Sequence, residues 1–308
     1  MISKILFILL VTQLLISCSS STKGSKNMAG SEKKDEFYWI ENSDFIPPEI
    51  EHYRKEMDYF LGGAEDKDVL SNESLSRASS PRLESVQAKD QPIGQANSLC
   101  HQGEFEQAEK ILRGNFLKFH KHPSYWNQVG VCYFLKNEYR KALLFFNKSR
   151  ELDIKYSPAI NNLAVLYLRQ GEDAKALEAL LSVIKMDRKA KTPKFNLAQL
   201  YLRYGFFDQA FPLLMSLHQE QNKDIDVING LATYHLAKGN PRKAISLFAQ
   251  IPEPHSLSPY IALNHALALI LSEKKTEARE LIERVDAKQL ESLSKQYEKI
   301  KQLLGDQA

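Results

Sequence analysis

The chain has 308 residues, 43% of them hydrophobic, which is enough apolar side-chain surface to form a substantial packed core. The formal net charge is only +3, which argues against a protein dedicated to nucleic-acid binding. The sequence contains no HExxH motif, no G-x-S-x-G motif, no phosphate-binding loop and no pair of Cys-x-x-Cys motifs. We therefore expect a protein that is not an enzyme and that needs no metal ion or other cofactor.

The N-terminus begins with one basic residue, Lys4, followed by an apolar run from Ile5 to Ile16. This run is too short to span a bilayer and has the length of a signal-peptide core. It ends in Leu-Ile-Ser-Cys, with the cysteine at Cys18, which resembles the lipobox of bacterial lipoproteins. The resemblance implies a signal peptide over residues 1–17 and a lipid-modified Cys18 that anchors the protein in a membrane. An ordinary signal peptide with an incidental cysteine is the alternative.

The residue after the cysteine is Ser19 rather than Asp, which by the same resemblance implies sorting to the outer membrane of a two-membrane bacterium. We therefore expect a lipid-anchored protein of the cell envelope that faces the periplasm. Residues 18–34 are rich in Ser, Lys and Gly, a composition typical of a flexible tether.

Residues 35–63 form an acidic segment in which seven aromatic residues lie between positions 35 and 60. Pro48 and the two glycines at 62 and 63 are typical of the start and end of a short helix. Residues 35–73 carry twelve acidic and three basic side chains, whereas residues 89–308 carry 24 acidic and 31 basic ones. We expect the segment either to dock on the basic part of the chain or to bind another protein. Residues 64–88 are polar and Ser-rich, as in a disordered linker.

The remainder of the chain contains small or turn-forming residues that recur with a period of 34 residues. One row consists of Ala108, Ala142, Ala176, Ala210, Ala244 and Ala278; a second of Ala96, Gly130, Ala164, Ala198, Ala232 and Ala266; and a third of Gly103, Asn137, Gly171, Gly205, Gly239 and Glu273. Five of the six residues in the third row are Gly or Asn, which tolerate the left-handed backbone conformation just past a helix end. The register continues through six units without an insertion, so chance does not explain it.

The period and the residue types resemble the tetratricopeptide repeat, a helix–turn–helix unit of 34 residues. The second unit follows the W-x2-L-G-x2-Y and A-x3-F spacing of that family with Trp126, Val129, Gly130, Tyr133, Ala142 and Phe146. The resemblance implies an all-α fold: an α-solenoid of about six repeats over residues 89–292, with a C-terminal capping helix over residues 290–308. It also implies that the small residues lie where the two helices of a repeat cross.

In the tetratricopeptide family the exposed face of each first helix lines a concave groove that binds protein segments. The positions that carry over are Asn127, Val131, Phe134, Asn161, Val165, Leu168, Phe195, Gln199, Leu202, Asn229, Thr233 and Leu236, followed by Leu263, Leu267 and Ile270 in the sixth unit. Some grooves in the family clamp a terminal carboxylate with Lys at the first position of each unit, where this chain has Asn, Phe or Leu. We therefore expect asparagines that pair with the backbone of an extended peptide and apolar rows that take its side chains. The alternative is that part of this surface is core.

Cys100 and Cys132 fall on the first helices of units one and two. A disulfide requires α-carbons within about 7 Å, and packed helices usually lie further apart. We therefore expect buried free thiols, with a disulfide as the alternative in an oxidising compartment. Five basic residues cluster between units three and four, namely Lys185, Arg188, Lys189, Lys191 and Lys194. This cluster is expected to be a solvated edge, with a docking patch for an acidic partner or lipid headgroups as the alternative.

The sequence therefore predicts a membrane-anchored scaffold that binds envelope proteins through the repeat groove and binds no nucleic acid and no small-molecule substrate. Its architecture resembles that of the outer-membrane lipoproteins that assist secretin, pilus or motility machines. An adaptor for cell-wall hydrolases or for outer-membrane assembly factors is the second hypothesis. An enzyme with an unrecognised site is the third.

Overall fold

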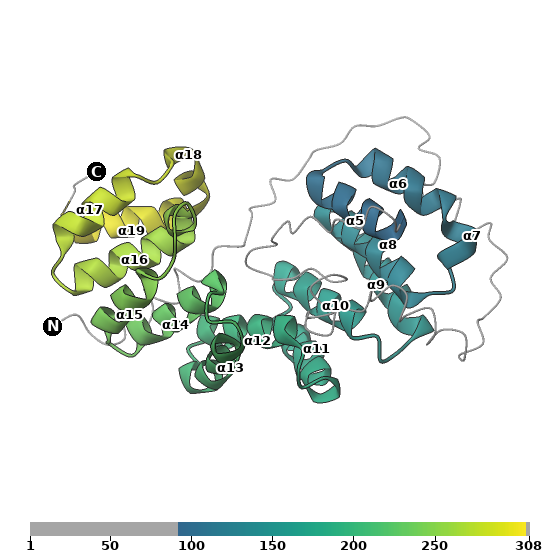
Figure 1. The fold of residues 1–308 in the computed structure, drawn as a ribbon, viewed down its shortest axis with the longest axis horizontal. Helices are drawn as coiled ribbons and strands as arrows, with labels where there is room; N and C mark the ends of the chain where they lie inside the picture. The colour runs from purple at the N-terminus through teal and green to yellow at the C-terminus, as the bar shows by residue number, and fades with distance from the viewer. Residues whose placement is uncertain (1–91, 306–308) are drawn as a thin grey trace. The chain divides into compact units, whose positions relative to one another are not determined.

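The structure is a computed structural model that describes residues 92–305. The described residues are largely helical and contain no strand (Figure 1). They divide into two compact units, one that ends at Thr192 and one that begins at Pro193, and each unit is described separately. The lipobox with Cys18, the acidic segment 35–63 and the linker 64–88 lie outside the described residues, so predictions about them stay predictions.

The unit that ends at Thr192 contains three helix–turn–helix pairs. The pairs are α5 (Pro92–Gln102) with α6 (Phe105–Gly114), α8 (Pro123–Leu135) with α9 (Tyr139–Leu152), and α10 (Ser157–Gln170) with α11 (Asp173–Met186), and the short α7 (Phe116–Phe119) joins the first two pairs. In each pair the two helices pack on each other, and α8 also contacts both α5 and α10. The first helices therefore stack side by side within this unit.

The second unit repeats the same pattern. Its helices are α12 (Lys191–Arg203, which begins two residues before the boundary), α13 (Phe207–Glu220), α14 (Ile225–Ala237), α15 (Pro241–Phe248), η1 (His255–Leu257), α16 (Pro259–Leu271), α17 (Lys275–Glu283), α18 (Ala287–Leu290), η2 (Glu291–Leu293) and α19 (Ser294–Leu304). The last helix, α19, contacts both α16 and α17. Leu290, Leu293, Ile300 and Leu304 are buried in the core of this unit, so the predicted C-terminal cap is confirmed.

The turn between the two helices of each pair has the backbone conformation that the third row of repeated residues predicts. All six residues of that row adopt a positive φ between 63° and 84°. Asn137 and Glu273 do so with a side chain, and in both φ is 63°. The backbone therefore keeps the same turn even where glycine is absent, because the packed helices on either side determine the conformation.

The two rows of small residues lie where the helices cross, as predicted. All six alanines of the first row are fully buried, and so are the five alanines of the second row. At Gly130, the remaining member of the second row, an added β-carbon would lie 2.5 Å from Cδ1 of Phe146. Helices α8 and α9 therefore approach so closely at this point that no larger residue fits without a shift of the Phe146 ring.

One sequence prediction is wrong: Cys100 and Cys132 form a disulfide, whereas free thiols were expected. Their α-carbons lie 5.1 Å apart, which is well within the range that a disulfide bridges. The prediction of free thiols assumed that the two α-carbons are as far apart as the axes of packed helices usually are. The two cysteines, however, lie on surfaces of α5 and α8 that face each other directly, so their α-carbons are closer than the axes.

Candidate protein-binding site

The twelve residues predicted to line the groove lie on α8, α10, α12 and α14, which are the first helices of repeats two to five. Ten of them are buried, and only Leu168 and Gln199 keep partial exposure. Their placement on the first helices follows from the repeat register. Their role in binding a partner stays a prediction.

Two of the asparagines at the first groove position, Asn127 and Asn229, form hydrogen bonds with the residue that follows the first position in the next repeat. In the unit that ends at Thr192, Nδ2 of Asn162 on α10 donates to Oδ1 of Asn127 on α8 over 2.8 Å. In the other unit, Nδ2 of Asn264 on α16 donates to Oδ1 of Asn229 on α14 over 3.3 Å. Both pairs are buried and both span 35 residues, so the same amide contact links first helices in two separate places.

These amide pairs explain why an asparagine can be buried at this position. A buried polar group must be hydrogen-bonded, because an unpaired one costs about 1–3 kcal/mol. A primary amide has two donors and one acceptor with two lone pairs, and Nδ2 of Asn264 also donates to Oγ1 of Thr233 over 3.5 Å. The two amide pairs therefore link neighbouring first helices inside the core.

The apolar members of the predicted groove belong to the core clusters of their units. Val131, Phe134 and Val165 pack with Phe146 and Leu166, and the pairs Phe195–Leu202 and Leu236–Leu267 lie in two clusters of the second unit. Sequence periodicity alone does not separate these positions from a groove lining, since both lie on first helices. These apolar residues are therefore part of the core, which was the alternative interpretation of the predicted groove.

The two partly exposed positions are Leu168, near the end of α10, and Gln199 on α12. Gly230 on α14 lies close to Gln199: an added β-carbon at Gly230 would be 3.3 Å from Nε2 of Gln199. The lack of a side chain at residue 230 leaves room for this amide. Leu168 and Gln199 are accordingly the groove positions at which a substitution disturbs the core least.

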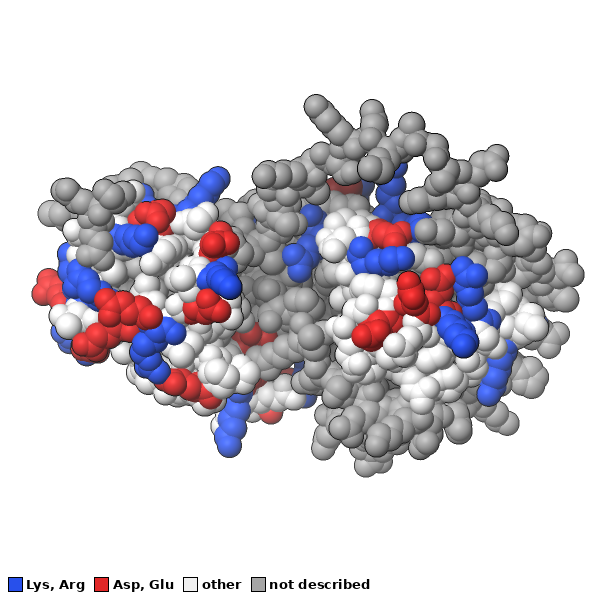
Figure 2. Space-filling view, turned by 90° about the horizontal axis from the view of Figure 1, so that it is seen from above, with Lys and Arg blue, Asp and Glu red and all other residues white. Residues whose placement is uncertain are grey.

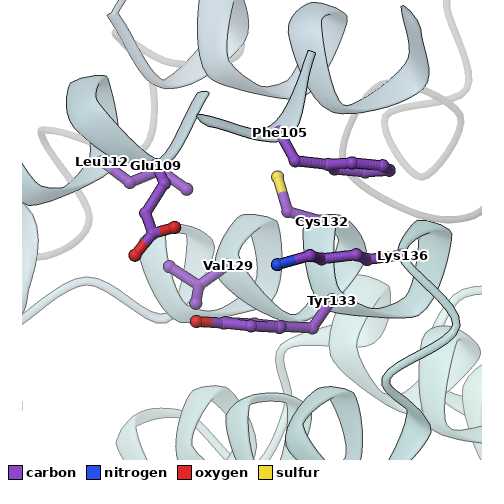
Figure 3. A pocket seen from close by; sticks show the side chains of 7 residues that line it. All are labelled: Phe105, Glu109, Leu112, Val129, Cys132, Tyr133 and Lys136. Carbon is purple, nitrogen blue, oxygen red and sulfur yellow. The ribbon is translucent and has the colours of Figure 1, made fainter. Parts of the chain in front are cut away.

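A pocket lies between α6 and α8, at the disulfide (Figure 3). Its lining consists of Phe105, Glu109, Leu112, Val129, Cys132, Tyr133 and Lys136, around a space of about 380 Å³ that includes its open mouth. Burial and the carboxylates of Glu109 and Glu138 raise the pKa of Tyr133 to about 12, so this phenol is neutral at physiological pH. The pocket is mainly apolar and suits an inserted apolar side chain better than a reaction.

An exposed aromatic pair that the sequence analysis did not single out lies at the turn of the fourth repeat. Tyr204 and Phe206 flank Gly205 and are both more than half exposed. In the other five turns the two flanking residues are polar: Gln and Glu in the first and third repeats, Lys and Glu in the second, Lys and Asn in the fifth, and Ser and Lys in the sixth. Aligning the turns by the 34-residue register would have revealed this difference, and it marks Tyr204 and Phe206 as candidate partner contacts.

Lys and Arg side chains are interspersed with Asp and Glu side chains on the face shown in Figure 2. Between residues 92 and 305, no group of three or more His, Cys, Asp or Glu side chains could hold a metal ion. Over the same range, none of the helices combines the length and the apolar character needed to cross a membrane. In the predicted basic cluster, Lys185, Arg188 and Lys189 are exposed, while Lys191 and Lys194 are half-buried.

Comparison with known proteins agrees with this fold. Residues 157–189 match the family model described as tetratricopeptide repeat. None of the curated protein sequences matches the chain. The structure is similar to a chain of the APC/C hetero-tetramer Cut9–Hcn1, with a TM-score of 0.58 and 18% identity, over 82% of this chain and 54% of that one. The chain therefore spans about half the length of that protein.

The structure is also similar to pilF of Pseudomonas aeruginosa, with a TM-score of 0.56 and 18% identity, over 70% of this chain and 97% of that one. At such identities the likeness concerns the fold alone. Together with the helix pairs, the six left-handed turns and the repeat at residues 157–189, it shows that the chain is an all-α protein with the tetratricopeptide α-solenoid fold.

Proposed function

We propose that the protein is a membrane-anchored scaffold of the bacterial cell envelope that binds segments of partner proteins through the first-helix surface of its repeats. The observation that carries the proposal is the tetratricopeptide-type fold, in which the first helices of two repeats keep partly exposed side chains at predicted groove positions, Leu168 on α10 and Gln199 on α12. A partner segment that lies along the first helices can reach these partly exposed side chains. Assembly of a secretion, pilus or motility machine is the setting we propose for this scaffold.

Two observations support the envelope location. The lipobox-like sequence ends at Cys18, and the other two of the three cysteines are joined to each other. Stable disulfides are typical of oxidising compartments such as the periplasm and are rare in the cytosol. Cys18 is the remaining cysteine of the three, and lipid modification would give it a function without a disulfide partner.

The binding surface can be tested with a substitution that leaves the core intact. Leu168→Glu places a charge on the partly exposed end of a first helix, so we expect it to weaken capture of envelope proteins by at least about tenfold. The matched control is Leu181→Glu, which makes the same change on α11, the second helix of the same repeat, where Leu181 is 45% exposed. Affinity capture from detergent-solubilised membranes measures both variants, and circular dichroism checks that both remain helical.

The proposal predicts that the same partner is lost with Leu168→Glu and retained with Leu181→Glu. Loss with the control alone would move the site to the second helices. Equal retention with both variants would exclude the first-helix surface of the third repeat from partner binding.

A further inference from the structure

In the unit that ends at Thr192, the connections between successive repeats have an unusual surface. We define the basic edge as three such connections, residues 115–122, 153–156 and 185–190. Because the helices of stacked pairs alternate in direction, the connections from one repeat to the next gather at one end of the stack. The turns within the pairs, at Gly103, Asn137 and Gly171, lie at the other end.

Each connection of the basic edge presents a large aliphatic side chain to solvent. Leu117 is 85% exposed, Ile154 is 75% exposed and Met186 is 44% exposed. The neighbours of the first two are anchored in the core: Phe116 and Phe119 on either side of Leu117, and Tyr156 after Ile154, are all buried. The aliphatic side chains therefore project outward from a fixed backbone rather than from loosely held loops.

Six exposed basic residues surround these aliphatic side chains, namely Lys118, Lys121, Lys155, Lys185, Arg188 and Lys189. The two acidic residues of the same connections, Asp153 and Asp187, accept hydrogen bonds from backbone amides two residues later, over 2.8 and 2.9 Å. These carboxylates shape their turns, and they are outnumbered three to one by the cations. The edge is therefore both apolar and strongly basic.

The opposite end of the same unit differs in both respects. Each of its turns places a glutamate directly after the left-handed residue, at Glu104, Glu138 and Glu172. Among the described residues of the unit, the exposed large hydrophobic side chains lie on the basic edge or on the second helices, and none lies in these turns. The basic edge is thus a property of one end of the stack and not of the whole surface.

We propose that the basic edge rests on an anionic lipid bilayer, with Leu117, Ile154 and Met186 inserted among the lipid headgroups. Isolated aliphatic side chains amid lysines are suited to the membrane interface, where the apolar tips enter and the ammonium groups meet lipid phosphates. A protein partner is less well matched, since lysine is depleted at protein–protein interfaces. The contact would orient the repeats on the membrane and is independent of the acyl anchor that we propose at Cys18.

Vesicle sedimentation tests this proposal without the acyl anchor. The chain from Ser19 onward keeps every described residue and lacks both the signal peptide and Cys18. It should sediment with phosphatidylcholine vesicles that contain phosphatidylglycerol and not with phosphatidylcholine alone, and added salt should release it. Leu117→Asp with Ile154→Asp should weaken the binding by at least about tenfold. The two substitutions remove aliphatic side chains that enter the bilayer and add two carboxylates that the anionic lipids repel.

The matched control is Leu144→Asp with Leu181→Asp, which makes the same changes at side chains that are 54% and 45% exposed on the second helices α9 and α11. The control pair should bind vesicles as the unmodified chain does. Equal loss in both pairs, or no binding to anionic vesicles, would overturn the proposal. So would binding to soluble polyglutamate without binding to anionic vesicles, which would make the edge a docking surface for an acidic protein.

Discussion

At the scale of single residues, the repeat register predicts backbone conformation as well as residue type. Gly103, Gly171, Gly205 and Gly239 have the positive φ that glycine permits. Glutamate does not by itself indicate a positive φ, yet the φ of Glu273 is 63°. A left-handed residue with a side chain costs about 1–2 kcal/mol, which the packing of α16 on α17 offsets. Position within the repeat was therefore a better predictor than amino-acid identity.

A substitution at Gly130 tests how closely helices α8 and α9 pack. Gly130→Ala would place a β-carbon 2.5 Å from the ring of Phe146, which is fully buried and has little room to move. We expect the substitution to lower the free energy of unfolding by about 1–3 kcal/mol, as overpacking of a core does. The change in urea denaturation midpoint measures it.

The control for this prediction is Gly114→Ala, at the end of α6, where an added β-carbon meets no atom within 4 Å. Alanine favours the helix over glycine by about 0.5–1 kcal/mol, so this variant should be as stable as the original or slightly more so. If both substitutions shift the midpoint equally, close approach of α8 and α9 is not what requires glycine at residue 130.

At the scale of helices, the period of 34 residues was sufficient to predict the pairs and their turns, and the resemblance to the tetratricopeptide repeat added the C-terminal cap. It was insufficient for the contact between α5 and α8, because a disulfide depends on which faces of two helices meet and the register does not specify this. The first repeat also lacks the large aromatic residue of the second, with Pro92 where the second has Trp126. The disulfide supplies a covalent link where this terminal repeat has less to pack.

The disulfide should accordingly determine the stability of the first helix pair. Cys100 and Cys132 are 32 residues apart in the sequence, and loss of a disulfide typically costs about 2–5 kcal/mol. In Cys100→Ala with Cys132→Ala, we expect amide hydrogen exchange to become faster mainly in α5 and α6, while α10 and α11 keep their protection.

Reduction of the unmodified protein should reproduce this exchange pattern, which separates loss of the bond from loss of the two sulfur atoms. Unchanged protection of α5 and α6 in the variant would mean that packing alone holds the first repeat. Detection of free thiols at both positions in the oxidised, unfolded protein would mean that the bond does not form.

At the scale of the molecule, sequence reasoning gave the fold class but not the chemistry of its surfaces. Groove positions such as Val131 and Leu202 were assigned from the register, yet they are buried in the cores of their units. The basic edge was predicted only in part: the cluster at 185–194 was noticed, whereas Leu117 and Ile154 were not. The exposure of a side chain depends on how much of it the neighbouring repeat covers. Residue type and spacing in the sequence do not determine this.

The central claim is that the first-helix surface binds a partner while Cys18 holds the protein at a membrane. It is tested most directly by a photo-reactive amino acid at Leu168, introduced in cells that express the chain with either Cys18 or Cys18→Ala. With Cys18 present, we predict a cross-linked partner in the membrane fraction after a high-salt wash, which releases the contact proposed for the basic edge. With Cys18→Ala, that adduct should leave the washed fraction because the acyl chains supply the salt-resistant membrane affinity. An adduct formed from Leu181 but not from Leu168, or a membrane fraction unchanged by Cys18→Ala, would contradict the account.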